Sequence, residues 1–279
     1  MSEFIKINGR KISVDYPPYI IAEMSANHNR SIDNAFKIID IAKISGADAV
    51  KLQTYHPDTI TMNMNSPEFI IKGGLWDGQS LYELYESAFM PWEWHKPLFD
   101  HAKKRDITIF SSPFDSTAVD LLEDLNAPAY KIASFENNHI PLIDKVSKTG
   151  KPVIISTGLA DYKELSEIVK IFKKNKNDNF CFLKCTSNYP ASIEDVNLIN
   201  IIELQKKFKC AIGLSDHTID NIAAITSIAL GSRIIEKHVK LNNKLNSLDS
   251  AFSLSVDDFK EFVDSVHRAY SSIGTKGKI

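Results

Sequence analysis

The sequence is poor in three features that each mark a class of protein. It has three cysteines in 279 residues, an odd number without a CxxC pair, which argues against a disulfide framework and leaves buried thiols as the expectation. No apolar run approaches the roughly 20 residues that span a bilayer, and the N-terminus lacks a signal-peptide core. With a net charge of -2, the chain has no basic excess to attract nucleic acid or anionic membrane. We therefore expect a cytoplasmic protein that binds neither.

Short apolar runs alternate with segments of helical spacing along almost the whole chain. Eight runs are strand-like, at 18–23, 48–54, 107–112, 127–134, 151–157, 180–187, 211–218 and 232–239. The helical segments are predicted at 31–45, 91–105, 115–126, 139–149, 161–174, 196–207, 218–230 and 255–271. Parallel strands need helical crossovers, and eight of them close a sheet. The pattern predicts an α/β fold, a (β/α)8 TIM barrel over residues 19–279, with a doubly wound open sheet as the alternative.

Two segments depart from this alternation. FIKINGRKISV alternates apolar and polar residues around Asn8-Gly9, which predicts a hairpin at 4–14, within an N-terminal segment 1–18 that caps one end of the barrel. The connection between Thr54 and Pro91 is far longer than a typical strand-to-helix loop, so we expect it to be functional, as a substrate lid or as a protein-interaction surface. The aromatic residues in and just after it are expected to pack on the barrel rim or to line a pocket wall; they include Trp76, Tyr82, Tyr85, Phe89, Trp92 and Trp94.

Polar residues end nearly every strand-like run. Active sites of TIM barrels lie at the C-terminal ends of the strands, so these residues should surround one mouth. They are Glu23, Lys51, Gln53, Ser112, Lys131, Ser134, Ser156, Ser187, His217, Glu236 and His238. A single strand lysine can equally extend to the surface or pair with a carboxylate. Two lysines among several hydroxyl groups, however, predict a site for a small substrate that carries phosphate and carboxylate.

The histidines differ in where they fall along the predicted elements. His217 and His238 end neighbouring strands and can converge on an exchangeable divalent ion. His28 lies just beyond the first strand beside Asn27, where a hydroxyl-rich substrate would need hydrogen-bond partners. The helical histidines, which are His95, His101 and His267, are expected at the surface.

Nine motifs, in this order, carry a resemblance to a known family. They are EMSANHN, KLQT, FSSPFD, YKIASFE, ISTGLA, CTSNYP, GLSDHT, EKHV and LDSAFSL, and they extend through almost all of residues 19–254. Together they resemble the sialic acid synthase family, whose members condense phosphoenolpyruvate with an amino sugar to form nonulosonic acids. The resemblance implies a metal-dependent transferase on a TIM barrel.

The resemblance also implies a role for each matching residue. His217 and His238 would bind the divalent ion, with Mn²⁺ expected and Mg²⁺ or Co²⁺ as alternatives. Glu23 would face the reacting carbons and direct the attacking water, and it would form the catalytic set with both histidines, Lys51 and Lys131. Phosphoenolpyruvate would be held by Lys51, Ser112, Lys131, Ser134, Ser156 and Ser187. The residues implied beside the sugar are Asn27, His28, Gln53, Tyr189, Glu236, Asp249 and Ser250.

Two segments bear on the choice of sugar. The stretch 73–95 and LDSAFSL are most similar to the branch that uses 2,4-diacetamido-2,4,6-trideoxy-L-altrose. Sialic and legionaminic acid enzymes usually carry histidine where this chain has Ser250, so they are the alternative. Family members form a homodimer in which a small antifreeze-like domain covers the partner's site. That domain is absent from residues 1–279, which leaves a non-catalytic binding barrel as a further alternative.

Overall fold

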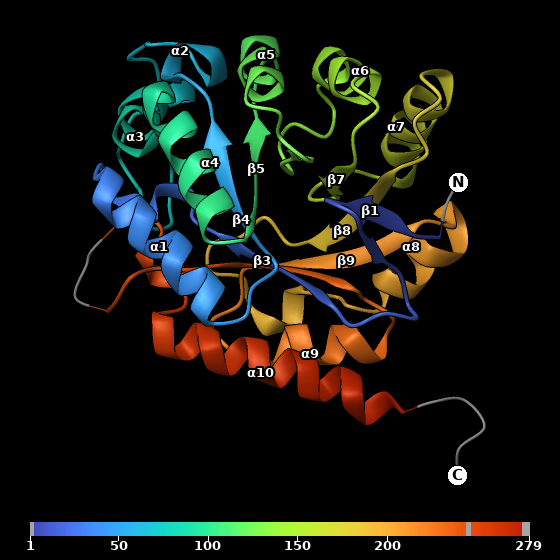
Figure 1. The fold of residues 1–279 in the computed structure, drawn as a ribbon. Coiled ribbons are helices and arrows are strands. Elements are labelled where there is room, and N and C mark those ends of the chain that lie inside the picture. The colour runs from blue at the N-terminus through green and yellow to red at the C-terminus, as the bar shows by residue number, and fades with distance from the viewer. Residues whose placement is uncertain (1–2, 244–246, 275–279) are drawn as a thin grey trace.

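A computed structural model describes residues 3–243 and 247–274 and shows a closed barrel of eight parallel strands surrounded by helices (Figure 1). The strands are β3 (Tyr19–Glu23), β4 (Ala49–Thr54), β5 (Thr108–Pro113), β6 (Tyr130–Ile132), β7 (Val153–Ser156), β8 (Phe180–Cys185), β9 (Ala211–Asp216) and β10 (Ile234–His238). They pair in chain order, and β10 closes the barrel against β3. The predicted TIM barrel is therefore confirmed.

The eight predicted helical segments are all present. They are α1 (Ile32–Ile44), α4 (His95–Lys104), α5 (Ser116–Asp124), α6 (Ile140–Lys148), α7 (Tyr162–Lys174), α8 (Asn200–Phe208), α9 (Ile222–Ala229) and α10 (Val256–Ile273). Three helices begin about four residues later than predicted, because turns such as η3 (Trp92–Trp94) and η4 (Ile193–Asp195) precede α4 and α8. Within the described ranges, none of the helices could cross a membrane.

The barrel interior is built in two layers. Successive strand residues face opposite sides, so every second residue points inward. The lower layer is apolar and packs Ile21, Ala49, Phe110, Ile154 and Ile234 among its members. Two positions further along most of the strands, the inward residues become polar, as in the step from Ile21 to Glu23 or from Ala49 to Lys51. A single alternation thus places a hydrophobic core directly beneath a polar site.

The N-terminal hairpin closes the bottom of the barrel. Strands β1 (Ile5–Ile7) and β2 (Arg10–Ile12) pair antiparallel across the Asn8-Gly9 turn, as predicted. Ile5, Ile7 and Ile12 are fully buried in the same cluster as the lower barrel layer. The Asn179 side chain fixes the hairpin to the barrel through hydrogen bonds to the backbone N–H and carbonyl of Lys6.

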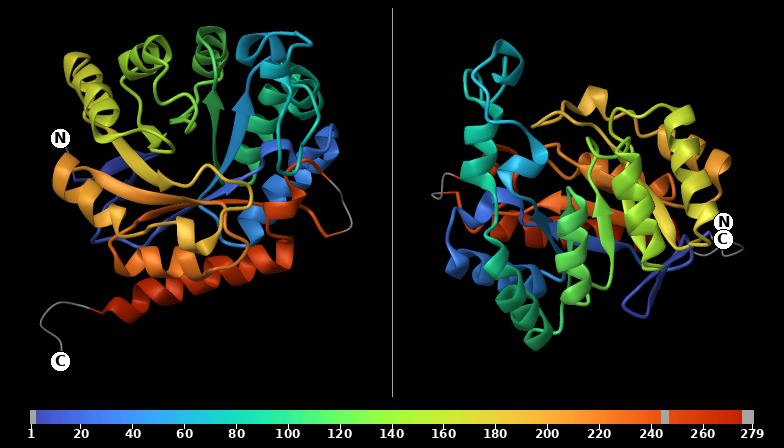
Figure 2. Two further views of the ribbon diagram at one scale, coloured as in Figure 1. Left: turned by 180° about the vertical axis from the view of Figure 1, so that it is seen from behind. Right: turned by 90° about the horizontal axis from the view of Figure 1, so that it is seen from above.

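The long connection after β4 is more structured than its sequence suggested. It contains α2 (Pro57–Ile60), η2 (Pro67–Phe69) and α3 (Leu81–Ala88), and it projects at one side of the barrel (Figure 2, right). The Ser80 hydroxyl caps α3 by accepting a hydrogen bond from the Glu83 N–H at 3.1 Å. Leu84, the buried residue of α3, fixes this helix over the mouth of the barrel.

Candidate active site

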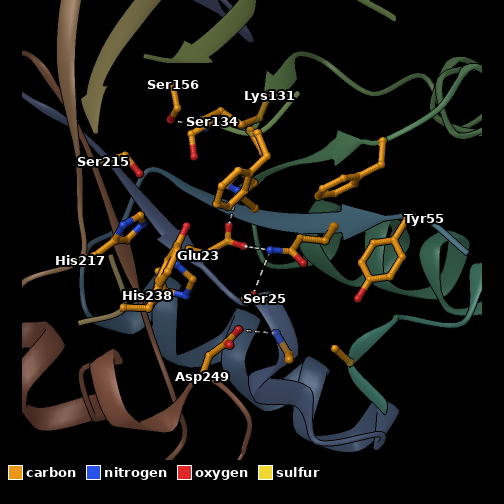
Figure 3. A pocket seen from close by; sticks show the side chains of 18 of the residues that line it. Glu23, Ser25, Tyr55, Lys131, Ser134, Ser156, Ser215, His217, His238 and Asp249 are labelled. Carbon is orange, nitrogen blue, oxygen red and sulfur yellow. Dashed lines mark hydrogen bonds and ion pairs between the residues drawn. The ribbon is translucent and has the colours of Figure 1, made fainter. Parts of the chain in front are cut away.

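A cavity opens at the C-terminal ends of the strands, where the polar layer lies (Figure 3). Its empty volume, with the open solvent at the mouth included, is about 1040 Å³. Eleven of the predicted site residues line it, namely Glu23, Lys51, Gln53, Lys131, Ser134, Ser156, Tyr189, His217, Glu236, His238 and Asp249. The strand-end rule therefore brings together residues that lie more than 200 positions apart in the chain.

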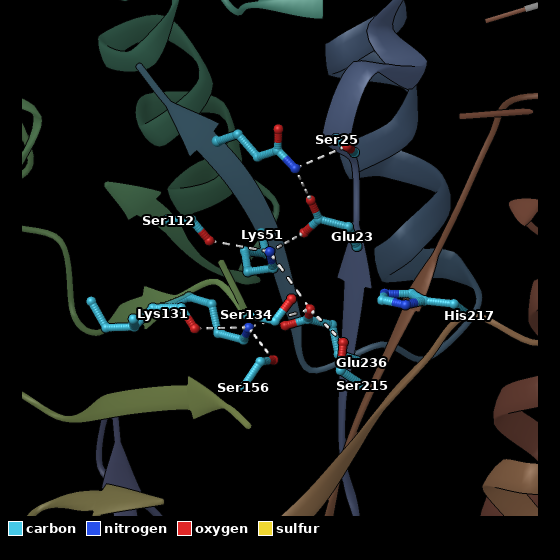
Figure 4. A network of polar contacts seen from close by, with 12 residues as sticks. Glu23, Ser25, Lys51, Ser112, Lys131, Ser134, Ser156, Ser215, His217 and Glu236 are labelled. Carbon is cyan, nitrogen blue, oxygen red and sulfur yellow. Dashed lines mark hydrogen bonds and ion pairs between the residues drawn. The ribbon is translucent and has the colours of Figure 1, made fainter. Parts of the chain in front are cut away.

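Two buried lysines form the floor of this cavity (Figure 4). Lys51 Nζ donates to Ser112 Oγ at 3.2 Å, and Lys131 Nζ donates to Ser156 Oγ at 2.6 Å. Glu236 lies between them, with Oε1 at 3.6 Å from Lys51 Nζ and 3.8 Å from Lys131 Nζ. Ammonium and hydroxyl groups grouped in this way are suited to hold the oxygens of a phosphate and a carboxylate.

Burial and charge set the protonation of this floor. Burial opposes the Lys51 charge, but Glu23 and Glu236 outweigh this effect and raise the pKa of Lys51. Burial lowers the pKa of Lys131, which has no carboxylate as near as the Glu23 partner of Lys51. The pKa of Glu236 is lowered because the two lysines outweigh its own burial.

Glu23 lies beside this floor and is nearly inaccessible to solvent. Its Oε2 is 2.8 Å from Lys51 Nζ, and its Oε1 accepts a hydrogen bond from Gln53 Nε2 at 3.3 Å. Gln53 also donates to Ser25 Oγ at 3.0 Å, so its amide orients the carboxylate. Burial raises the pKa of Glu23 to about 7 despite the adjacent Lys51. A carboxyl group with such a pKa can both accept and release a proton near neutral pH.

The two strand-end histidines lie side by side at the mouth, on the neighbouring strand ends of β9 and β10. Their ring centroids are 5.4 Å apart, and the Tyr189 ring lies 4.3 Å from that of His217. Phe252 contacts the His238 ring edge-on at 4.9 Å. Burial lowers the pKa of His217 to about 4 and also lowers that of His238, which keeps both imidazoles neutral. Neutral imidazole is the form that binds metal ions.

The histidine pair fits a divalent ion that is completed by other ligands. The Thr186 carbonyl is 2.8 Å from His217 Nδ1, which would leave Nε2 available for coordination. His238 Nδ1 and Glu236 Oε2 are buried and have no hydrogen-bond partner among the described residues. No group of three or more histidine, cysteine or acidic side chains in the described ranges forms a complete cage. Such a set suits an exchangeable ion whose remaining ligands are water and substrate oxygens.

Five predicted site residues do not line the cavity. Ser112 and Ser187 lie behind the lining and bond to it, through Lys51 and through Ser134 Oγ at 2.9 Å. The Asn27 amide donates to the Val239 carbonyl and to Ser253 Oγ, so it holds the chain around Asp249 in place rather than meeting a ligand. The remaining two are His28 and Ser250.

Two histidines lie deeper than expected. His28 is 1% exposed, packs edge-on against Trp94 and does not line the cavity, so its contact with the sugar stays a prediction. His95 was expected at the surface but is fully buried, with Nε2 2.7 Å from the Thr54 hydroxyl. His95 shares the buried face of α4 with Leu98 and Ala102, three and seven residues further on. That spacing is the signal that could have identified it as a core residue.

Several lining residues were not among the predicted site residues. Ser25 follows β3, Ser215 precedes His217 by two positions, and Cys185 ends β8. Ser215 Oγ donates to Glu236 Oε1 at 3.2 Å, and inward alternation from Gly213 could have indicated this position. Trp76 and Tyr85 confirm that some aromatic residues of the long connection line the pocket wall. The other missed lining residues are Ala26, Tyr55, Ile60, Leu84, Ala88, Phe114, Ala133, Phe135, Glu136 and Leu248.

The chain matches the NeuB family over residues 38–278. It is 50% identical over 262 residues to the pseudaminic acid synthase of Campylobacter jejuni, covering 94% of this chain and 76% of that protein. It is 46% identical over 258 residues to the pseudaminic acid synthase of Helicobacter pylori, covering 92% and 76% of the two chains. Identity to the N,N'-diacetyllegionaminic acid synthase of C. jejuni is 34% over 258 residues, covering 91% and 77%.

A solved structure shares the whole fold. The N-acetylneuraminic acid synthetase of Leptospira borgpetersenii, solved in complex with citrate, superposes with a TM-score of 0.87 at 29% sequence identity. The match covers 100% of this chain and 92% of that chain.

Proposed function

The chain belongs to the NeuB family, and we propose that it is an enzyme that condenses phosphoenolpyruvate with 2,4-diacetamido-2,4,6-trideoxy-L-altrose to form pseudaminic acid and phosphate. The observation that carries the chemistry is the shared cavity of two buried lysines and two neutral histidines. Identity of 46–50% to pseudaminic acid synthases, against 34% to a legionaminic acid synthase, supports this sugar over the alternative.

Phosphoenolpyruvate is assigned to the lysine floor. Lys51, Lys131 and the adjacent serines would hold its phosphate and carboxylate, which positions the methylene carbon and neutralises charge. The sugar aldehyde would lie toward His217 and His238. These histidines would hold a divalent ion, for which Mn²⁺ is proposed, and the ion would supply Lewis-acid polarisation of the aldehyde.

The bond changes follow from these positions. The methylene carbon attacks the aldehyde carbon, a carbon–carbon bond forms as the double bond of phosphoenolpyruvate opens, and the aldehyde oxygen takes up a proton from solvent. Positive charge develops at the phosphate-bearing carbon, to which water adds. Glu23 accepts a proton from this water, for which its pKa of about 7 is suited. The tetrahedral intermediate then expels phosphate by cleavage of the carbon–oxygen bond, while the lysines stabilise the departing charge.

A phosphate-release assay tests the reaction and the sugar. The protein is incubated with Mn²⁺, phosphoenolpyruvate and, separately, the diacetamido sugar, N-acetylmannosamine or the legionaminic acid precursor. We expect release with the diacetamido sugar and oxygen-18 from water in the C2 carbonyl of the product. Release only with another sugar contradicts the substrate, and ligand binding without release at high protein concentration supports the non-catalytic alternative.

The proposal extends to the cellular compartment and the oligomeric state of the enzyme. We place it in the cytoplasm, where phosphoenolpyruvate is made and where free buried thiols such as Cys181 and Cys210 persist. A homodimer is the proposed assembly. Light scattering of the purified chain tests it.

A further inference from the structure

One end of the cavity differs in chemistry from the charged floor. In Figure 3, Tyr55 lies on the far side of Glu23 from His217 and His238. The wall at this end comes from the long connection: Leu84, Tyr85 and Ala88 lie on one face of α3, and Ile60 ends α2. A substrate whose aldehyde is at the histidines therefore presents its other end to an apolar wall.

A partly exposed glutamate with one buried carboxylate oxygen lies at this end of the cavity. Glu136 follows β6, lines the cavity, and has its Oε2 buried without a hydrogen-bond partner among the described residues. No ion pair within the described ranges involves it. Burial raises the pKa of Tyr85 on α3, and the charge of the nearby Glu136 raises it further. A buried acceptor without a partner is costly, which points to a ligand that donates to it.

The loop that carries Glu136 is held in place from both sides. The neighbouring Asn137 amide donates to the Thr157 carbonyl at 2.6 Å and to the Ser156 carbonyl at 3.2 Å. The Glu136 N–H donates to the Ala133 carbonyl at 3.2 Å, and the His139 N–H donates to the Glu136 carbonyl at 3.0 Å. Glu136 is thus preorganised at the cavity wall, so it need not be ordered when a ligand binds.

We propose that Glu136 and the α3 face form the subsite for the C4 acetamido group of the sugar. The amide N–H donates to the Glu136 carboxylate, and the acetyl methyl packs on the Leu84 and Ala88 side of the wall. Of the two acetamido groups in the proposed substrate, only the one at C4 lies three carbon–carbon bonds from the aldehyde carbon, toward this end. The subsite rests on the proposed function and specifies how that site recognises its sugar.

Two variants test the contribution of the Glu136 acceptor and that of the apolar α3 wall one at a time. Glu136→Leu removes the acceptor, and Ala88→Leu fills the space for the methyl group. Each should lower kcat/KM for the diacetamido sugar about 10-fold or more, because the loss of a buried hydrogen bond or of a close apolar contact costs about 1.4 kcal/mol. With the analogue that has hydrogen in place of the C4 acetamido group, each should change kcat/KM less than about 3-fold. Glu86→Leu, at an exposed position of α3, is the matched control and should behave as wild type.

Glu136→Gln distinguishes recognition from acid–base catalysis. Glutamine keeps an acceptor oxygen, so this variant should retain most of the activity that Glu136→Leu loses. An equal loss of kcat/KM in Glu136→Gln and Glu136→Leu, with both sugars, would indicate that Glu136 carries a proton. That result would overturn the subsite. Unchanged kcat/KM in Glu136→Leu and Ala88→Leu would overturn it as well. If the wild-type chain turns over only a different aldose, the proposed substrate fails first, and the subsite fails with it.

Discussion

The Glu23 carboxylate lies 2.8 Å from the Lys51 ammonium, and the two side chains are only 1% and 4% exposed. Strand register places them together, because Glu23 of β3 is the direct partner of Lys51 on β4. The pair is therefore fixed by the barrel itself. Removing one member would leave a buried charge without compensation.

The first prediction concerns this pair. Lys51→Met should raise the KM for phosphoenolpyruvate, lower kcat at least 100-fold and destabilise the fold by about 3 kcal/mol. Urea unfolding and steady-state kinetics measure the two effects. Lys96→Met is the matched control: Lys96 forms an exposed ion pair with Asp100, so less than about 1 kcal/mol should be lost. Wild-type kinetics in Lys51→Met would contradict the assignment of this lysine to phosphoenolpyruvate binding.

The second prediction concerns the histidine pair. The His217→Ala, His238→Ala double variant should fold, because both imidazoles are neutral and leave no unpaired charge behind. Metal-dependent phosphate release should fall at least 1000-fold, and a chelator should abolish the activity of the wild-type chain reversibly. Circular dichroism and the release assay measure these outcomes. His139→Ala, at an exposed position, is the control. Full activity in the double variant contradicts the metal assignment.

The third prediction concerns pH and stability. Burial raises the pKa of Glu136 to about 7, above its ordinary value of 4.5, so the folded state favours the protonated form. The contribution of Glu136 to stability is fully present below pH 4.5 and is lost as pH rises through 7. Glu136→Gln should therefore be more stable than wild type at pH 8, by up to about 3 kcal/mol, and near wild type at pH 4.5. Urea midpoints at both pH values test this, and a pH-independent difference contradicts it.

The fourth prediction concerns packing inside the barrel. A Cβ on Gly213 of β9 would meet the Ile234 carbonyl oxygen and, at 2.5 Å, Leu183 Cδ2. Gly213→Ala should destabilise the protein by about 2–3 kcal/mol, since backbone on the neighbouring strand cannot move aside. Gly150→Ala adds a Cβ in open space at φ +71° and should cost only about 1 kcal/mol. Equal melting temperatures for the two variants would contradict this view of the interior.

Sequence could predict the parts of the site that follow from regular geometry. Alternation along strands and the barrel rule bring Glu23, Lys51 and His238 to one mouth, because the position of each depends only on its own strand. Glu136 and Tyr85 lie on connections, where no periodicity indicates the direction of a side chain. Asn27 shows a second limit: a polar residue beside a site can bond to ligand or to backbone, and only tertiary contacts decide which.

The hairpin at the bottom of the barrel also constrains the order in which the two substrates bind. Ile5, Ile7 and Ile12 close that end, so molecules can reach the lysine floor only from the mouth. With phosphoenolpyruvate on the floor and the sugar above it, as proposed, a sugar that arrives first would block the path. The expected kinetic mechanism is sequential and ordered, with phosphoenolpyruvate binding first. Initial-rate patterns with a dead-end analogue of the sugar would then show uncompetitive inhibition against phosphoenolpyruvate.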